Sequence, residues 1–142
     1  MANQADLVKR IIAAVVDLVI LAVVGGILML IFGAPLALTG DFAAMMAAGS
    51  VAWLVTALIS LAYFVYFEGT TGQTLGKKMV NIKVVMQKSG RQLEYADALV
   101  RNILRIIDFL PAFYILGLIL IAVSENKQRL GDMAAKTIVV EA

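Results

Sequence analysis

Two long apolar runs dominate the pattern of hydrophobic and polar positions along the chain. Residues 11–32 are interrupted by one charged residue, Asp17, and residues 43–67 are interrupted only by three serine and threonine side chains. At a rise of about 1.5 Å per residue, a helix over either run crosses a hydrocarbon core about 30 Å thick. The pattern therefore predicts two transmembrane helices, and the aromatic residues at 63–67 indicate that the second one ends at an interface.

A third apolar run, residues 106–123, is of a different kind. Asp108 and Pro111 lie near its start, which leaves an uncharged stretch at residues 110–123. A membrane-spanning helix needs about 20 residues, and this stretch is shorter. We therefore expect a third membrane segment that is short or re-entrant.

The residues before the third run have helical periodicity. Charged residues recur every three or four positions, which places them on one stripe of a helix, and apolar residues fill most other positions. The stripe consists of Glu94, Asp97, Arg101, Arg105 and Asp108. One interpretation is an amphipathic helix at the membrane interface with its charges in water. A second turns the stripe inward, so that Arg101, Arg105 and Asp108 meet the first membrane helix, and a third is an ordinary cytosolic helix.

A weak internal repeat links two distant segments. "QTLGKKMVNIKVV" at 73–85 and "QRLGDMAAKTIVV" at 128–140 align without gaps. Each predicts a turn at a glycine, Gly76 or Gly131, followed by a short strand rich in β-branched residues. If the two strands pair, both lie on one side of the membrane, so the chain between them crosses an even number of times or dips in and returns.

The amino-acid composition indicates whether the protein is soluble or lies in a membrane. Hydrophobic residues make up 62% of the chain and charged residues 15%, and the mean hydropathy is +0.94. These values are typical of a membrane protein, and 142 residues make one domain, residues 1–142. We therefore predict an all-α membrane protein with two transmembrane helices, a short or re-entrant third segment, an amphipathic interfacial helix and a small cytoplasmic β pair.

The absence of two residue types limits the metal, cofactor and catalytic sites that the chain can form. Cysteine and histidine are both missing, which removes the usual zinc, haem and iron–sulfur ligands and the commonest general base. We expect no cofactor, no metal site and no enzymatic activity. The formal net charge of +2 is too small to suggest nucleic acid, and it fits basic loops beside a bilayer with anionic headgroups.

The basic residues orient the two long helices. Lys9 and Arg10 precede the first apolar run, the linker at 33–42 contains no lysine or arginine, and residues 68–105 contain seven. The positive-inside rule therefore places the N-terminus and the long basic loop in the cytoplasm, in a multi-pass protein of the cell membrane. The basic C-terminal tail belongs on the same side by this rule, which conflicts with a single third crossing.

Arginine and aspartate recur at a fixed spacing. Arg10 and Asp17 are seven residues apart, which on a helix puts them on one face about 10 Å apart, and Arg101 and Asp108 repeat this spacing. An aspartate at the centre of a membrane helix costs about 2.5 to 3.5 kcal/mol, which the apolar residues of the helix offset. Such an acid indicates either a functional site or a structural polar contact between helices.

Several of these segments resemble the RDD family of small membrane proteins, which is named for an arginine and two aspartates. Arg10, Ala13 and Asp17 fit the pattern R-x-x-A-x-x-x-D of its first helix. The stretches "GTTGQTLGKKMVNIKVV", "LVRNILRIIDFLP" and "QRLGD" resemble its central loop, the following segment and its closing motif. The resemblance makes Arg10 the arginine and Asp17 the first aspartate, and it leaves Asp108 and Asp132 as candidates for the second. It also implies transport of a ligand that the family does not define.

Two hypotheses follow for function. The first is a small transporter of an ion or small solute, including cation/proton exchange, in which Asp17 is the ion or proton site and Arg10 or Arg101 is its charge partner. Arg105 and Asp108 complete this constellation, and Gly76, Gly131 and Asp132 form a structural motif. Because three membrane segments are few for a pathway through one chain, we expect a homo-oligomer. The second hypothesis is a non-catalytic scaffold or assembly factor whose charged residues lock helices together.

Overall fold

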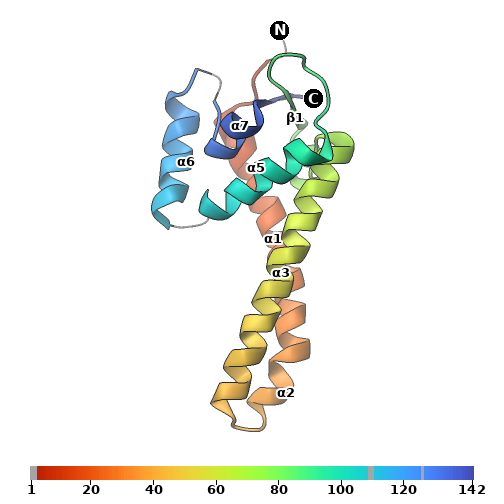
Figure 1. The fold of residues 1–142 in the computed structure, drawn as a ribbon, viewed down its shortest axis with the longest axis vertical. Coiled ribbons are helices and arrows are strands. Elements are labelled where there is room, and N and C mark those ends of the chain that lie inside the picture. The colour runs from red at the N-terminus through yellow and green to blue at the C-terminus, as the bar shows by residue number, and fades with distance from the viewer. Residues whose placement is uncertain (1–2, 109–110, 126) are drawn as a thin grey trace.

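The computed structural model of the protein describes residues 3–108, 111–125 and 127–142. Two long helices, α1 (Leu7–Phe32) and α3 (Phe42–Thr71), form an antiparallel hairpin, and the short helix α2 (Ala34–Ala37) lies at its tip (Figure 1). The shorter elements gather at the opposite end of the hairpin, near both chain termini. We call this end the head.

Local sequence sets the limits of both long helices. Asp6 and Asp41 precede α1 and α3, and their carboxylates accept hydrogen bonds from free backbone N–H groups at the helix starts. Helix α3 ends at Gly72, whose φ of 70° suits glycine. Both helices are long and apolar enough to cross a membrane, which confirms the two predicted helices. Their large apolar side chains point outward, as Leu30 and Trp53 do.

In the part of the chain that the structure describes, the head contains four helices and two strands. In chain order they are α4 (Leu75–Met79), β1 (Ile82–Met86), α5 (Tyr95–Asp108), α6 (Pro111–Val123), α7 (Leu130–Ala135) and β2 (Thr137–Glu141). Helix α4 packs against α1, and α5 packs against both α3 and α7. The strands pair antiparallel, with Val84 opposite Val139. This pairing confirms the strand pair predicted from the repeat.

A small apolar core holds the head together. It is built from side chains of both strands, of helices and of the segments that precede α1 and α5, and burial of such side chains is the main favourable contribution to folding. Its buried members are Ala5, Ala13, Ile82, Val84, Leu93, Ala98 and Val139. Because Ala13 belongs to α1, the core fixes the strands against the head end of that helix.

The strand pairing determines where the middle of the chain returns. Since β1 and β2 are neighbours, the segment between them begins and ends in the head. Helix α6 has 13 residues, fewer than the number needed for a crossing, and lies beside the other elements of the head, away from the hairpin tip (Figure 1). The described part of the third apolar run, residues 111–123, is therefore a short helix, and whether it enters a membrane stays a prediction.

Helix α5 turns the middle of its polar stripe inward. Arg101 is 3% exposed, whereas Leu99 and Ile103 on the opposite face are 41% and 47% exposed. The interpretation that leaves all the charges in water is therefore wrong for Arg101. The reason is that α5 packs its charged face on other charged groups of the head. The side chain of Asp108, at the end of α5, lies outside the described residues.

Candidate functional site

Arg10 and Asp17 lie on one buried face of α1, as their spacing predicts, but they bind different partners. The face also carries Ala13 and Leu21, at helical intervals of three and four residues. Arg10 turns toward α7, and Asp17 turns toward α3 and α4. Among the described contacts, Asp17 forms no ion pair with Arg10 or Arg101, because each of these groups has closer partners in the head.

Asp132 is the acid that joins the two arginines. Its Oδ2 lies 2.9 Å from Arg10 Nη2, and its Oδ1 lies 2.7 Å from Arg101 Nε. The backbone N–H of Arg129 donates to the same carboxylate at 3.1 Å, because Asp132 occupies the first turn of α7. Arg10 also donates to the carbonyl oxygen of Lys127. Of the two candidates for the second aspartate, Asp132 is thus the one that the described structure pairs with Arg10.

The surroundings of Asp132 keep it ionised. Burial alone would raise its pKa, but the neighbouring cations Arg101, Arg129 and Arg10 outweigh burial and lower the pKa well below its ordinary value. Its side chain is 1% exposed, so water contributes little to its solvation. Arg10 and Arg101, whose guanidinium groups contact this carboxylate, therefore solvate it in place of water.

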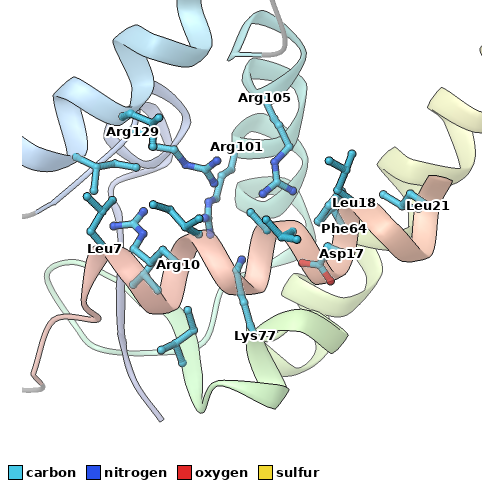
Figure 2. A pocket seen from close by; sticks show the side chains of 17 residues that line it. Leu7, Arg10, Asp17, Leu18, Leu21, Phe64, Lys77, Arg101, Arg105 and Arg129 are labelled. Carbon is cyan, nitrogen blue, oxygen red and sulfur yellow. The ribbon is translucent and has the colours of Figure 1, made fainter.

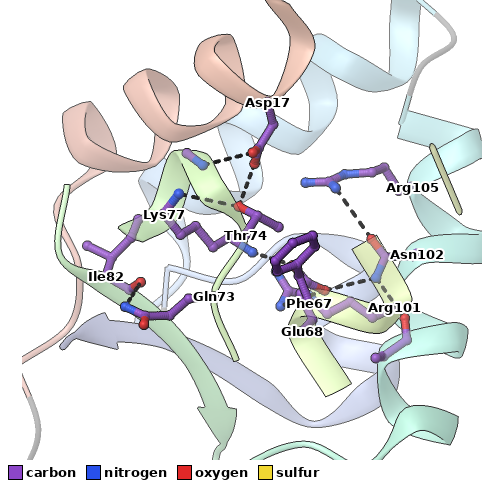
Figure 3. A network of polar contacts seen from close by, with 12 residues as sticks. Asp17, Phe67, Glu68, Gln73, Thr74, Lys77, Ile82, Arg101, Asn102 and Arg105 are labelled. Carbon is purple, nitrogen blue, oxygen red and sulfur yellow. Dashed lines mark hydrogen bonds and ion pairs between the residues drawn. The ribbon is translucent and has the colours of Figure 1, made fainter. Parts of the chain in front are cut away.

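Glu68 forms a second buried centre of charge, which the sequence analysis missed. Figure 3 shows its carboxylate among the side chains of Lys77, Arg101 and Asn102. Asn102 Nδ2 donates to Oε2 at 2.8 Å, and Arg101 Nη1 lies 3.6 Å from the same atom. Its position in the sequence could have marked Glu68 as a candidate, because it is the first acid after the second apolar run.

Lys77 is a buried cation with an unusual titration. Burial lowers the pKa of its ammonium group to about 7, because the attraction of Glu68 only partly offsets the lost hydration. The ordinary value is 10.5, so the folded protein releases this proton at a lower pH than the unfolded chain does. Folding therefore opposes protonation of Lys77.

This difference predicts how stability depends on pH. Between pH 7 and 9 the unfolded state binds more protons at Lys77 than the folded state, so the free energy of unfolding should rise with pH. Below pH 7 the contribution of Lys77 should become constant. Thermal unfolding in a mild detergent at pH 7, 8 and 9 measures the slope, and Lys77→Met should flatten it. A falling stability in this range, or the same slope in the variant, would contradict the assignment.

Asp17 fastens α1 to α3 and α4. Its Oδ1 accepts hydrogen bonds from Tyr63 Oη at 2.8 Å and from the backbone N–H of Gly76 at 2.9 Å, and its Oδ2 accepts one from Thr74 Oγ1 at 2.6 Å. The side chain is buried, with 2% of the residue exposed. Three donors satisfy this carboxylate, so its hydrogen bonds have a structural role.

The repeated glycines allow close contacts between helices. A Cβ atom on Gly76 would lie 2.2 Å from the carbonyl oxygen of Ala13 in α1, and one on Gly131 would lie 2.6 Å from the carbonyl oxygen of Arg101 in α5. No side chain fits at either distance. Each copy of the repeat therefore docks a short helix, α4 or α7, onto the backbone of a longer one.

Arg105 and Arg129 complete the cationic set. The guanidinium carbon of Arg105 lies 3.8 Å from the centre of the Phe64 ring, and its Nη1 donates to Asn102 Oδ1 at 3.4 Å. Burial, together with the nearby cations Arg129 and Arg101, lowers the pKa of Arg105 to about 10 against the attraction of Glu68. Among the described residues, neither Arg105 nor Arg129 forms an ion pair.

These groups surround a cavity of about 140 Å³ beside α1 (Figure 2). Its cationic lining residues are Arg10, Lys77, Arg101, Arg105 and Arg129. Asp17 also lines it, together with apolar side chains from α1, α3, α6 and both strands. The cavity can therefore hold a small polar group between cations and aliphatic side chains.

The predicted site residues are partly brought together. Four of them, Arg10, Asp17, Arg101 and Arg105, line this one cavity, while the side chain of Asp108 lies outside the described residues. The predicted structural motif takes part as well, because Asp132 binds two of the arginines and the two glycines position α4 and α7. The sequence analysis did not identify Glu68, Lys77 and Arg129 as site residues.

Comparison with known proteins gave one match. The model of the RDD family matches residues 4–136, which is nearly the whole chain. No curated protein and no solved structure matched the chain. The match includes Arg10, Asp17 and Asp132.

Proposed function

Because the chain belongs to the RDD family of membrane proteins, we propose that it transports a small solute across the cell membrane and that the cation-lined cavity is its binding site. The observation that carries the proposal is the convergence of five basic side chains on one cavity beside a membrane-spanning helix. Basic groups withdrawn from water are costly, and in membrane proteins such groups mark ligand and ion pathways.

The length of α1 suggests how the protein sits in the bilayer. A hydrocarbon core about 30 Å thick covers about 20 residues of helix, which extends from the hairpin tip to the region of Ala13. The head then lies at the cytoplasmic boundary, in agreement with its basic residues. Asp17 lies just inside the core, and the outward apolar residues of α5 face the lipid headgroups. In this arrangement α6 enters the membrane only partly.

Oligomer formation follows from the shape of the hairpin. Beyond the head, α1 and α3 are the two helices of the stem, and two helices cannot enclose a pathway (Figure 1). Their outward side chains are apolar and exposed, as Leu30 and Leu58 are. We therefore propose a homo-oligomer in which stems from several copies line the route from the cavity to the other side.

The charge of the cavity lining affects which solute the protein can transport. Cation/proton exchange at Asp17 stays a prediction, and two observations count against it. Both oxygens of Asp17 already accept hydrogen bonds, and five cations line the cavity beside it. An additional cation bound at Asp17 would be repelled by these five.

Flux measurements test transport directly. Purified protein in liposomes should take up at least one solute from a panel of inorganic anions, small carboxylates and monovalent cations. Arg105→Gln should reduce this flux strongly, since Arg105 lines the cavity without an ion pair among the described residues. Arg91→Gln, at an exposed position in the loop before α5, is the matched control and should leave the flux unchanged. A parent protein that is silent across the whole panel would contradict transport.

A scaffold role is the second candidate, and a specific observation favours it. Ion pairs and hydrogen bonds join α1, α3, α4, α5 and α7 into one network. If this network only locks the helices, Asp17→Asn should weaken assembly in detergent and the parent protein should show no flux. If the protein is a transporter, Asp17→Asn should retain its assembly, because Thr74 can rotate its hydroxyl to accept from the new amide.

A further inference from the structure

The walls of the cavity differ in chemistry. Five of the lining residues are basic, and we call them the basic wall; we call the aliphatic lining residues of α1 and α6 the aliphatic wall. The aliphatic wall includes Ile11, Val15 and Leu18 of α1, which are 40%, 52% and 54% exposed, and Leu118 and Ile121 of α6. The cavity lining thus combines basic side chains with exposed apolar ones.

The cations are unequally matched with acids. Arg10, Arg101 and Lys77 bind Asp132 and Glu68. Among the described residues, Arg105 and Arg129 form no direct ion pair, although both line the cavity. Glu68 and Asp132 attract their guanidinium groups only without direct contact, so the cavity beside these two arginines favours a negative charge.

The shape of the guanidinium group indicates the class of anion. Each guanidinium has five N–H donors in a plane, and Arg105 uses one of them, weakly, on Asn102 at 3.4 Å. Its ring contact with Phe64 fixes the plane of the group. Two such groups match the several oxygens of a phosphate, which arginine binds through paired hydrogen bonds. The cavity also has room for such a group. Its volume of about 140 Å³ is close to the volume of about 150 Å³ of a protein cavity that holds benzene.

We propose that this cavity binds a phosphate group, with Arg105 and Arg129 as its principal ligands. The inference rests on the proposed function and names the class of its solute. Two kinds of ligand carry such a phosphate group, inorganic phosphate and a phospholipid. Inorganic phosphate would occupy the basic wall alone, whereas a phospholipid would also lay its acyl chains on the aliphatic wall, as anionic lipids do in basic pockets between membrane helices.

Binding to delipidated protein in detergent tests the inference and separates the two kinds of ligand. The probes are inorganic phosphate and the soluble lipid dihexanoyl phosphatidic acid, with dihexanoyl phosphatidylcholine and sodium chloride at equal ionic strength as controls. We expect saturable binding of phosphatidic acid, measured by calorimetry, and weaker affinity by at least about tenfold in Arg105→Gln and in Arg129→Gln. Binding of inorganic phosphate at the same site would show that the acyl chains are dispensable.

Two variants guard against indirect effects. Arg91→Gln removes an exposed arginine and should bind like the parent. Ala14→Phe fills the cavity from α1 without removing a charge, and it should abolish binding while the circular dichroism spectrum is retained. Equal loss in Arg91→Gln, or undiminished binding in Ala14→Phe, would overturn the proposal.

Combined with the flux measurement, the binding data separate the two claims. Saturable phosphate or phosphatidic acid binding in a protein that shows no flux would support the site and contradict transport. Flux of some other solute without saturable binding of either probe would overturn the phosphate site and leave transport standing. Binding that follows ionic strength alone, with no preference over chloride, would also overturn it.

Discussion

Asp132→Asn should lower the free energy of unfolding by about 3 to 5 kcal/mol, which is the typical cost of breaking a buried ion pair from one side. The variant leaves Arg10 and Arg101 facing each other without the carboxylate that separates them at 2.9 and 2.7 Å. Asparagine keeps the size of the side chain, so the loss reports charge and not packing. Thermal unfolding or denaturant titration in a mild detergent measures the effect.

The matched control is a surface ion pair in the same head. Lys9 and Glu141 lie 2.6 Å apart, but their side chains are 39% and 41% exposed. Glu141→Gln should therefore cost only about 0 to 1 kcal/mol. Similar losses for Asp132→Asn and Glu141→Gln would mean that Asp132 is solvated by water and not by the two arginines.

Gly76→Ala should destabilise the protein by about 3 kcal/mol or prevent docking of α4, because forcing a methyl group into a packed contact is costly. The added Cβ would lie 2.2 Å from the carbonyl oxygen of Ala13 and 3.0 Å from the Asp17 carboxyl carbon. Backbone atoms cannot move aside as a flexible side chain can. The same unfolding measurement in detergent reports the loss.

Gly26→Ala is the control for this substitution. Gly26 lies within α1, and a Cβ there meets nothing within 4 Å. Alanine favours the helix by up to about 1 kcal/mol over glycine, so this variant should be as stable as the parent or more so. If both glycine variants are neutral, the close approach of α4 to α1 is not required for folding.

Periodicity carried much of the fold. The two long helices follow from apolar runs that are long enough for a membrane, and the strand pair follows from a repeated motif with β-branched residues. The common face of Arg10 and Asp17 follows from helix geometry alone. The helices and the individual strands depend on residues that are neighbours in sequence, and the pairing of the distant strands was inferred from the repeat.

Local sequence pattern could not predict which side chains contact one another. Arg10 and Asp132 are 122 positions apart in the chain, and Asp17 and Thr74 are 57 apart. Their contacts exist because Gly131 and Gly76 bring short helices onto α5 and α1, which no spacing rule describes. The direction of the α5 stripe was ambiguous for a related reason. In a membrane protein apolar residues can face lipid and charged residues can face the interior, so amphipathic pattern does not reveal which side is buried.

The shared cavity gives the family motif a physical meaning. Arg10 and Asp132 close the network on one side, while Asp17 holds α4 in place so that Lys77 reaches Glu68. These three residues, which are far apart in sequence, thus hold together the elements that line the basic cavity. The proposed phosphate site depends on this construction.

A pair of double-mutant cycles tests most directly which carboxylate Arg10 binds. The first cycle combines Arg10→Gln with Asp132→Asn, and the second combines Arg10→Gln with Asp17→Asn, with unfolding free energies measured in the same detergent. We predict a coupling of about 2 kcal/mol or more in the first cycle and additivity within about 0.5 kcal/mol in the second. Additivity between Arg10 and Asp132, together with strong coupling between Arg10 and Asp17, would contradict the network described here.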